Sequence, residues 1–219
     1  PQRRNMGSGN DQLWSHGNDW RRRVLDNYVI MPITINGSGT ITGVNVGGLP
    51  DGIVDTDMIA SSVTLGGLNE ADQWRITTDT TSSDTYLTSN WERNDTDFDK
   101  IGTGMSESSG IFSFPSTGIW LIWFTVQAKS GSDKRYVGCD VEITRNNGGA
   151  WTMRTYGYSA LVDGGATGYA SGHVNSIFDI TDTSNDKVRF HVNAAASLDF
   201  RGNSAANATY ATFMKLGAT

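Results

Sequence analysis

The stretch GIFSFPSTGIWLIWFTV, residues Gly110–Val126, is typical of two β-strands joined by a tight turn. Residues Ile111–Phe114 are aromatic and β-prone, and Pro115–Gly118 have turn chemistry, because Pro fixes φ and Gly permits a positive φ. Residues Ile119–Val126 are almost wholly apolar, whereas a strand with one face in water alternates apolar and polar residues. We therefore expect both faces of this strand to be covered, one by its own sandwich and the other by a partner subunit.

The chain from residue 70 onward repeats the pattern of short β-prone runs and polar turns. The turn Asn146–Gly149, between two such runs, is a strong hairpin signal. Because no amphipathic helix interrupts the pattern, it predicts one all-β sandwich or jelly roll over residues 70–219. The predicted strands lie near Gln73–Thr78, Tyr86–Glu92, Ile111–Phe114, Ile119–Ala128, Tyr136–Thr144, Trp151–Tyr158, His173–Asp179, Lys187–Asn193 and Thr209–Leu216.

Two segments precede this β domain. Residues 1–30 are polar and basic, and we expect them to be a disordered tail or foreign to the native chain. Residues 31–69 contain very short β-like pieces separated by glycines, none long enough to build a core of its own. Such pieces become stable when identical chains wrap together, so we expect an extended shaft or connector here. A flexible linker is the alternative.

Charge and cysteine content exclude several classes of protein. The net charge is −6, although the first 30 residues hold five Arg against three Asp, so the remainder is acidic. An acidic body repels phosphate backbones, which argues against nucleic-acid binding. No apolar run is long enough for a membrane span. The single cysteine, Cys139, cannot form an internal disulfide, so the fold needs a real core, and we expect Cys139 to be buried in it.

Several of these segments resemble known families. The run Phe112–Trp120 resembles the aromatic–Pro–Gly–aromatic strand pair of complement-1q/tumour-necrosis-factor-like (TNF-like) jelly rolls, and Ala208–Leu216 is similar to the last strand of that family. The segments Val46–Asp57 and Ile101–Met105 resemble parts of tail-fibre and other virion proteins of marine bacteriophages. The resemblance implies a jelly-roll homotrimer preceded by an extended shaft. Since the collagen-like stalk of complement proteins is absent, it does not imply a complement function.

The resemblance also implies which residues form the trimer interface. Successive side chains of a strand alternate between its faces. On the family pattern, the core side of the central strand carries Trp120, Ile122, Phe124 and Val126, and the outward side carries Leu121, Trp123 and Thr125. The interface candidates are Leu121 and Trp123 together with Tyr210 and Phe213 on the last strand. Ordinary core packing is the alternative for each.

A second group of aromatic residues is a candidate ligand site. Exposed aromatic rings stack on sugar faces, and Trp151, Tyr156, Tyr158 and Tyr169 lie in or beside a glycine-rich run. Residues Ser159–Ser171 of that run are predicted to form a long loop that reads a receptor. Packing of the same rings inside the sandwich is the alternative.

Signals for catalysis, cofactors or metal ions are poor. The sequence lacks the hydrolase, metalloprotease and phosphate-loop motifs, and its three His residues are scattered, so we expect neither an enzyme nor a cofactor. The run Asp95-Thr-Asp97-Phe-Asp99 begins as calcium loops do, but Lys100 follows where the helix–loop–helix motif needs Gly. A solvated acidic loop without a bound metal is the better interpretation.

These observations lead to a structural and binding role. We expect a trimeric virion protein of a bacteriophage, the head of a tail fibre or spike, on the surface of the particle. Its partners would be further copies of itself, other virion proteins and a host surface glycan or protein. The alternatives are a capsid decoration trimer and a soluble carbohydrate-binding module, which predicts a monomer with a sugar cleft.

Overall fold

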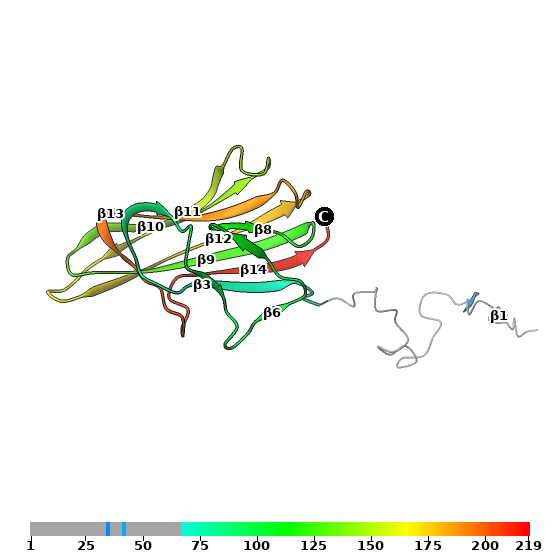
Figure 1. Cartoon of the computed structure of the whole chain (residues 1–219), viewed down its shortest axis with the longest axis horizontal. Coiled ribbons are helices and arrows are strands. Elements are labelled where there is room, and N and C mark those ends of the chain that lie inside the picture. Colours follow the sequence, from blue (N-terminus) through cyan, green and yellow to red (C-terminus); the bar gives the residue numbers. More distant parts are fainter. Residues whose placement is uncertain (1–33, 36–40, 43–66) are drawn as a thin grey trace, which may run out of the picture. The chain divides into compact units, whose positions relative to one another are not determined.

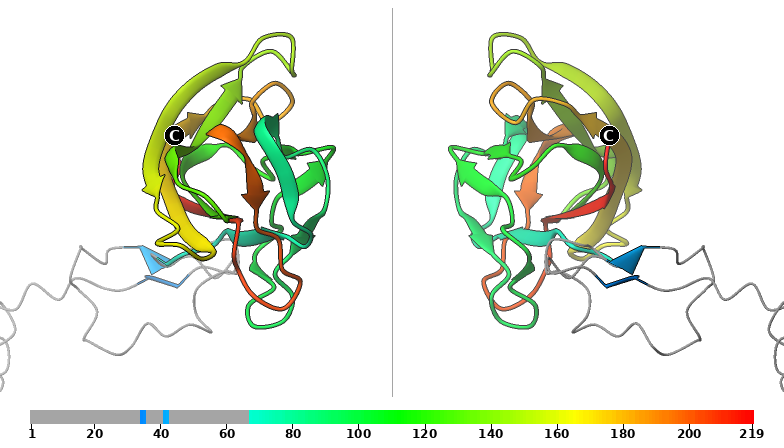
Figure 2. Two further views of the ribbon diagram at one scale, coloured as in Figure 1. Left: turned by 90° about the vertical axis from the view of Figure 1, so that its left-hand side faces the viewer. Right: turned by 90° about the vertical axis from the view of Figure 1, so that its right-hand side faces the viewer.

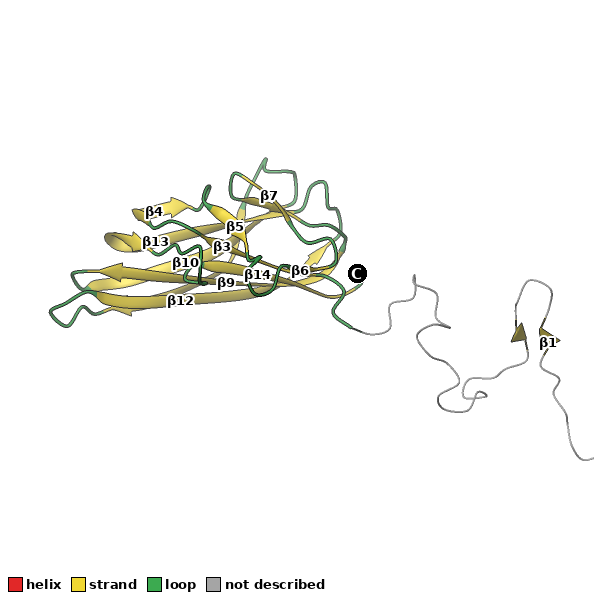
Figure 3. Cartoon of the chain, turned by 60° about the horizontal axis from the view of Figure 1, so that its bottom comes forward, coloured by secondary structure: helices red, strands yellow, loops and turns green. Residues whose placement is uncertain are grey.

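The computed structural model describes residues 34–35, 41–42 and 67–219. β1 (Thr34–Ile35) and β2 (Ile41–Thr42) form an antiparallel pair. Residues 67–219 form an all-β unit, and none of the described residues is helical (Figures 1 and 3). In this part of the chain there is accordingly no helix long and apolar enough to cross a membrane. The tail and most of the shaft expected from the sequence lie outside the described residues, so the boundaries of these segments stay a prediction.

Twelve strands make up the β unit, and they pair antiparallel throughout. They are β3 (Ala71–Ile76), β4 (Thr80–Tyr86), β5 (Trp91–Arg93), β6 (Lys100–Ile101), β7 (Ser106–Ser108), β8 (Ile111–Ser113), β9 (Gly118–Ser130), β10 (Lys134–Thr144), β11 (Thr152–Leu161), β12 (Gly168–Ile180), β13 (Lys187–Phe200) and β14 (Tyr210–Gly217).

The strands form two facing layers. In one, here the β9 sheet, the order is β12-β9-β14-β3, with β5 and β6 along the far edge of β3. In the other, the β10 sheet, the order is β11-β10-β13, and β13 pairs on its free side with β4 and then β8. Both layers curve around a shared interior, as the end-on views of Figure 2 show. The last residues of β13 pair with β9, and the Ser159 hydroxyl of β11 donates to the Ser171 carbonyl of β12, so the layers also meet at their edges.

Aromatic and branched side chains from both sheets fill the interior. Phe112 lies at its centre, with its ring centroid 5.4 Å from that of Phe190 and 5.2 Å from that of Phe213. Phe124 of β9 stacks on Phe190 of β13 at 4.6 Å, which joins the two sheets directly. Cys139 is a free thiol in this core, as predicted. Burial in apolar surroundings raises the pKa of Cys139 to about 12.

The stretch that predicted the fold lies at the centre of it. β8 and β9 face each other across the core, and the turn between them ends at Gly118, whose φ of 144° is open to glycine but strained for other residues. A β-carbon at Gly118 would also lie 2.5 Å from the carbonyl oxygen of Gly217. β9 then runs for 13 residues and pairs with β12 on one side and β14 on the other.

The other predicted strands are present, although β6 and β7 were not predicted and two predictions are wrong. Tyr86–Glu92 is not one strand, because β4 ends at Tyr86 and the chain turns through Asn90, which has a φ of 63°, before β5. The long loop predicted over Ser159–Ser171 is also wrong. β11 continues to Leu161 and β12 begins at Gly168, so only residues 162–167 connect them. The predicted hairpin turn at Asn146–Gly149 does join β10 to β11.

Candidate functional site

The outward side of the β9 sheet carries large apolar side chains. Leu121 of β9 is flanked by Ile177 of β12 and Met214 of β14, its direct partners across the strands. In the next row Trp123 lies between Asn175 and Thr212. Trp123 is 43% exposed and Ile177 61% exposed, so this apolar face, defined as Leu121, Trp123, Ile177 and Met214, is covered by nothing else in the described part of the chain.

The alternation predicted for β9 agrees with this arrangement. The four residues assigned to the core side, Trp120, Ile122, Phe124 and Val126, are each at most 1% exposed. Thr125 does point outward, but it is buried because His173 of β12 and Tyr210 of β14 flank it, and its hydroxyl lies 3.1 Å from Nδ1 of His173. The burial pattern therefore follows from the neighbouring strands as well as from β9 itself.

Of the two interface candidates on β14, only Tyr210 lies on the outward side. Tyr210 is half-buried beside Thr125. Phe213 points the other way and is fully buried against Phe112 and Phe190, so it is a core residue that a second chain cannot reach. The assignment of Phe213 to an interface is corrected here. Its position three residues after Tyr210 places it on the opposite side of a regular strand.

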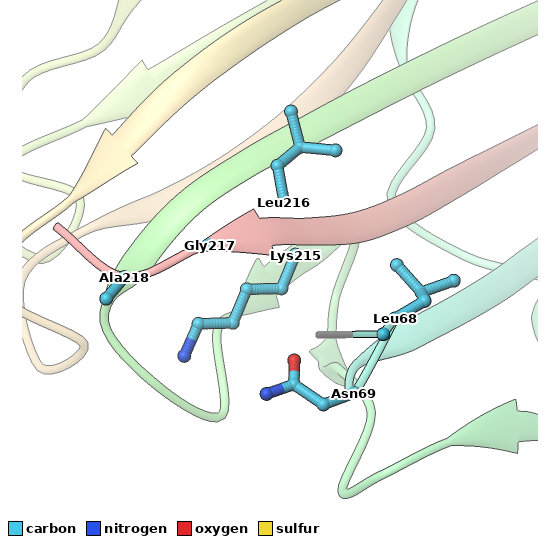
Figure 4. A pocket seen from close by; sticks show the side chains of 7 residues that line it. Leu68, Asn69, Lys215, Leu216, Gly217 and Ala218 are labelled. Carbon is cyan, nitrogen blue, oxygen red and sulfur yellow. The ribbon is translucent and has the colours of Figure 1, made fainter. Parts of the chain in front are cut away.

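Two hollows lie along β14, and the first of them shares Met214 with the apolar face. One, of about 490 Å³, lies over β3 and β14 and is lined by Leu68, Ala71, Gln73, Asn94, Asp97, Phe98, Asn207, Thr212 and Met214. The other, of about 510 Å³, lies between the start of β3 and the end of β14 and is lined by Gly67, Leu68, Asn69, Lys215, Leu216, Gly217 and Ala218. In Figure 4 the side chains of Lys215 and Asn69 extend on the same side of the β14 ribbon, and Leu216 extends on the other. Both hollows include Leu68, which is 44% exposed, so apolar surface extends beyond the apolar face.

The outward side of the β10 sheet carries tyrosines instead. Tyr156 and Tyr158 of β11 are 64% and 55% exposed, and their ring centroids are 5.7 Å apart. Tyr136 of β10 meets Tyr158 edge to face at 5.4 Å. Tyr158 lies opposite Gly138 of β10, and a β-carbon on Gly138 would lie 2.5 Å from its ring. The absence of a side chain at Gly138 therefore lets the Tyr158 ring lie against the sheet.

A polar network adjoins these tyrosines. Asp140 lies opposite Tyr156 on one side and His191 on the other. Both ring nitrogens of His191 reach carboxylates: Nδ1 lies 2.8 Å from Asp140, and Nε2 contacts Asp84 of β4. The hydrogen bond to Asp140 is the main cause that raises the pKa of His191 above its usual value of 6.5, and Asp84 adds to it.

Two acceptor atoms of this network have no partner among the described residues. They are Oδ1 of Asp140, a side chain with no exposed surface, and Oδ1 of Asn193 on β13. Asn193 lies opposite Gly138, and its Oδ1 is 2.3 Å from the point where a β-carbon of Gly138 would be. The Asn193 oxygen and the Tyr158 ring therefore meet above the same glycine.

The remaining two aromatic candidates lie apart from the tyrosine pair. Trp151 is half-buried, and the guanidinium of Arg189 stacks on its ring at 4.3 Å while binding Glu142. Tyr169 is exposed but belongs to β12, on the outward side of the β9 sheet, where its ring lies 5.5 Å from the guanidinium of Arg201. The structure thus brings Tyr156 and Tyr158 together and leaves Tyr169 on the other sheet.

Sequence reasoning missed the residues that complete both faces. Ile177 and Met214 on the apolar face, and Asp140, His191 and Asn193 beside the tyrosines, lie on strands distant in sequence from the residues they adjoin. No local motif marks them. The register of the antiparallel pairs is the signal that finds them, and it is a property of the folded sheet.

The acidic run Asp95–Asp99 lies in the loop between β5 and β6. Asp95 is 3.7 Å from Arg75, whose side chain is buried under this loop and also bonds Glu92, Asn94 and Thr96. Among the described residues no group of three or more His, Cys, Asp or Glu side chains is arranged to hold a metal ion.

Comparison with known proteins identifies the fold. No protein-family model matches the sequence, and no curated protein matches it. A structure of Eiger TNF from S. frugiperda is similar, with a TM-score of 0.51 and 9% identity over 68% of this chain and 93% of that one. A crystal structure of murine APRIL at pH 5.0 gives a TM-score of 0.49 and 17% identity over 67% of this chain and 98% of that one. The fold is a TNF-like jelly roll, and the sequence-based prediction of the fold is confirmed.

Proposed function

We propose that the chain is the binding head of a homotrimer that uses the apolar face for assembly. The observation that carries this proposal is the exposure of Trp123 and Ile177 beside Leu121 and Met214 on adjacent strands. Monomeric soluble proteins rarely expose contiguous apolar patches larger than roughly a few hundred Å², and patches above that size mark a contact with another molecule. A second copy of the chain is the partner favoured by the jelly-roll fold, since the trimer is the assembly that the family resemblance implies.

The finer part of the proposal is a virion protein of a bacteriophage, on the surface of the particle. Its support is the resemblance of Val46–Asp57 and Ile101–Met105 to segments of tail-fibre and other virion proteins. In this role residues 31–69 form the shaft that joins the head to other virion proteins. The three heads present identical faces to a host surface, so that weak single contacts add up to avidity. A trimer that decorates the capsid is the close variant.

The first test is the mass of the full chain in solution by light scattering. The proposal predicts three times the 23.7 kDa of one chain, without change on dilution through the micromolar range. A clean monomer at high concentration contradicts it. That result would instead favour a soluble carbohydrate-binding module, for which the exposed rings of Tyr156 and Tyr158 are the supporting observation.

A further inference from the structure

We propose that the outward side of the β10 sheet binds a neutral glycan at the tyrosine face, defined as Tyr136, Tyr156 and Tyr158 with Gly138, Asp140 and Asn193. This inference rests on the binding role proposed above but not on the trimer. It names the class of ligand and places the site on the sheet opposite the apolar face. β10 and β11, which carry most of it, can be followed in Figure 1.

The tyrosines supply a flat apolar surface with polar edges. Tyr156 and Tyr158 project from the same side of β11 and expose more than half of their surface. Rings exposed to this extent bury little apolar area when the single chain folds. Tyr136 supports Tyr158 edge to face, which restricts how far the Tyr158 ring can turn. A ring pair of this kind offers stacking area for the C–H side of a pyranose, and the phenol hydroxyls, which bond no other described residue, can bond its hydroxyls.

The second, independent observation is the pair of acceptors without partners. Oδ1 of Asp140 is buried and bonded to nothing in the described part of the chain, and so is Oδ1 of Asn193. A buried acceptor without a donor is costly and calls for an explanation. Both oxygens belong to residues on the outward side of the sheet, since Asp140 lies opposite Tyr156 and Asn193 lies opposite Gly138. The proposal requires the exposed Tyr156 side chain to turn aside when a ligand reaches them. A ligand rich in hydroxyl donors then provides the missing hydrogen bonds.

The charges at the centre of this face favour a neutral ligand. The centre holds the carboxylates of Asp84 and Asp140 around a single histidine, His191. The cations Arg135, 5.9 Å from the centre of the Tyr136 ring, and Arg154, two residues before Tyr156 on β11, lie at its margin. Arg189, the nearest cation on β13, is already paired with Glu142 and stacked between Tyr86 and Trp151. A carboxylated or sulfated sugar would bring negative charge next to two carboxylates in a protein of net charge −6. A neutral sugar meets no such repulsion and still supplies donors.

The placement of the site is compatible with assembly. The apolar face belongs to the β9 sheet and the tyrosine face to the β10 sheet, so each looks away from the shared core in its own direction. Contact between subunits through the β9 sheet leaves the β10 sheet open to solvent. The chemistry agrees with this division, because Trp, Leu, Ile and Met suit a permanent dry contact, whereas Tyr suits reversible recognition.

The test is binding of the full chain to immobilised neutral oligosaccharides built from glucose, galactose or mannose, with alginate as an acidic comparison. We expect at least one neutral oligosaccharide to bind, and Tyr158→Ala and Tyr156→Ala each to weaken that binding by about tenfold or more. Gly138→Ala should weaken it similarly, because the new methyl group displaces both Tyr158 and Asn193. Tyr169→Ala is the matched control, an exposed tyrosine on the other sheet, and should bind like the native chain.

Each outcome decides the inference. If no neutral oligosaccharide binds a folded chain, or if Tyr169→Ala weakens binding as much as Tyr158→Ala, the assignment of the tyrosine face to a glycan is wrong. Stronger binding to alginate than to every neutral sugar also overturns it. The mass of each sample by light scattering separates this inference from the proposed function: a trimer that binds no sugar refutes the glycan site alone, and a monomer that binds sugar refutes the trimer alone.

Discussion

Truncation of Trp123 should dissociate the proposed trimer without unfolding the subunit. Trp123 is 43% exposed in one chain, and a Trp side chain buries up to about 250 Å², so roughly 100 Å² remains for a neighbouring subunit to cover. At about 25 cal/mol per Å² this is about 2.5 kcal/mol per subunit and about 7 kcal/mol for three. That free energy corresponds to about five powers of ten in the dissociation constant of the trimer.

The measurable consequence is a shift in the concentration at which the trimer dissociates. Because the dissociation constant of a trimer scales with the square of concentration, Trp123→Ala should raise the midpoint by roughly 300-fold relative to the native chain. Analytical ultracentrifugation over a dilution series gives this midpoint. Trp123→Glu should act more strongly, since it would bury a charge in the contact.

A matched control distinguishes a lost contact from a damaged fold. Tyr156 is more exposed than Trp123 and lies on the β10 sheet, so Tyr156→Ala should dissociate like the native chain. Both variants should keep a cooperative thermal transition, because neither side chain belongs to the core. If Trp123→Ala stays folded and dissociates over the native concentration range, the apolar face is not the assembly surface and the reasoning fails.

Three further predictions concern the single chain. Phe213→Ala should lower the free energy of unfolding by about 3–5 kcal/mol in guanidinium titrations, because it empties the space between Phe112 and Phe190; a loss below about 1 kcal/mol would contradict its place in the core. The pKa of His191 is raised in the folded state, so its stabilising effect is complete below pH 6.5 and is lost as pH rises through the raised value; His191→Gln should flatten that part of the stability curve, and an unchanged slope would refute the assignment. Cys139 is buried and has a pKa of about 12, so it should react with a thiol reagent only at the rate of unfolding. Rapid labelling of the native chain would be inconsistent with its burial.

Local alternation made much of the fold predictable. The two-residue period of a strand separates Trp120 and Ile122 from Leu121 and Trp123 without any knowledge of their neighbours, and the burial of β9 follows it. Turn chemistry likewise marks the hairpin between β10 and β11. The errors arose where the sequence does not alternate between apolar and polar residues. In the glycine-rich run Ser159–Ser171, small residues extend β11 and β12 instead of forming a long loop.

The candidate sites were less predictable because they depend on contacts distant in sequence. His191 meets Asp140 across 51 residues and Asp84 across 107, and no local pattern encodes either pairing. The sequence groups Tyr169 with Tyr156 and Tyr158 because they lie in or beside one glycine-rich run, although the fold places them on different sheets. A residue list taken from a run of sequence thus becomes a surface only after the register of the sheets is known.

The register of β9 links the fold to the proposed assembly. The first half of β9, residues 119–124, is apolar on both sides, so within it the sequence does not show which side faces the core. Its partner β12 alternates clearly, with Val174 and Phe178 inward and His173 and Asn175 outward, and this alternation specifies which side of the pair is the core. A polar residue at position 123 would be at least as compatible with the fold of one chain as Trp. It would also mark more clearly which side of β9 faces solvent. The presence of Trp123 and Leu121 on the solvent side is therefore unexplained by folding, and the proposed contact with a second chain would account for it.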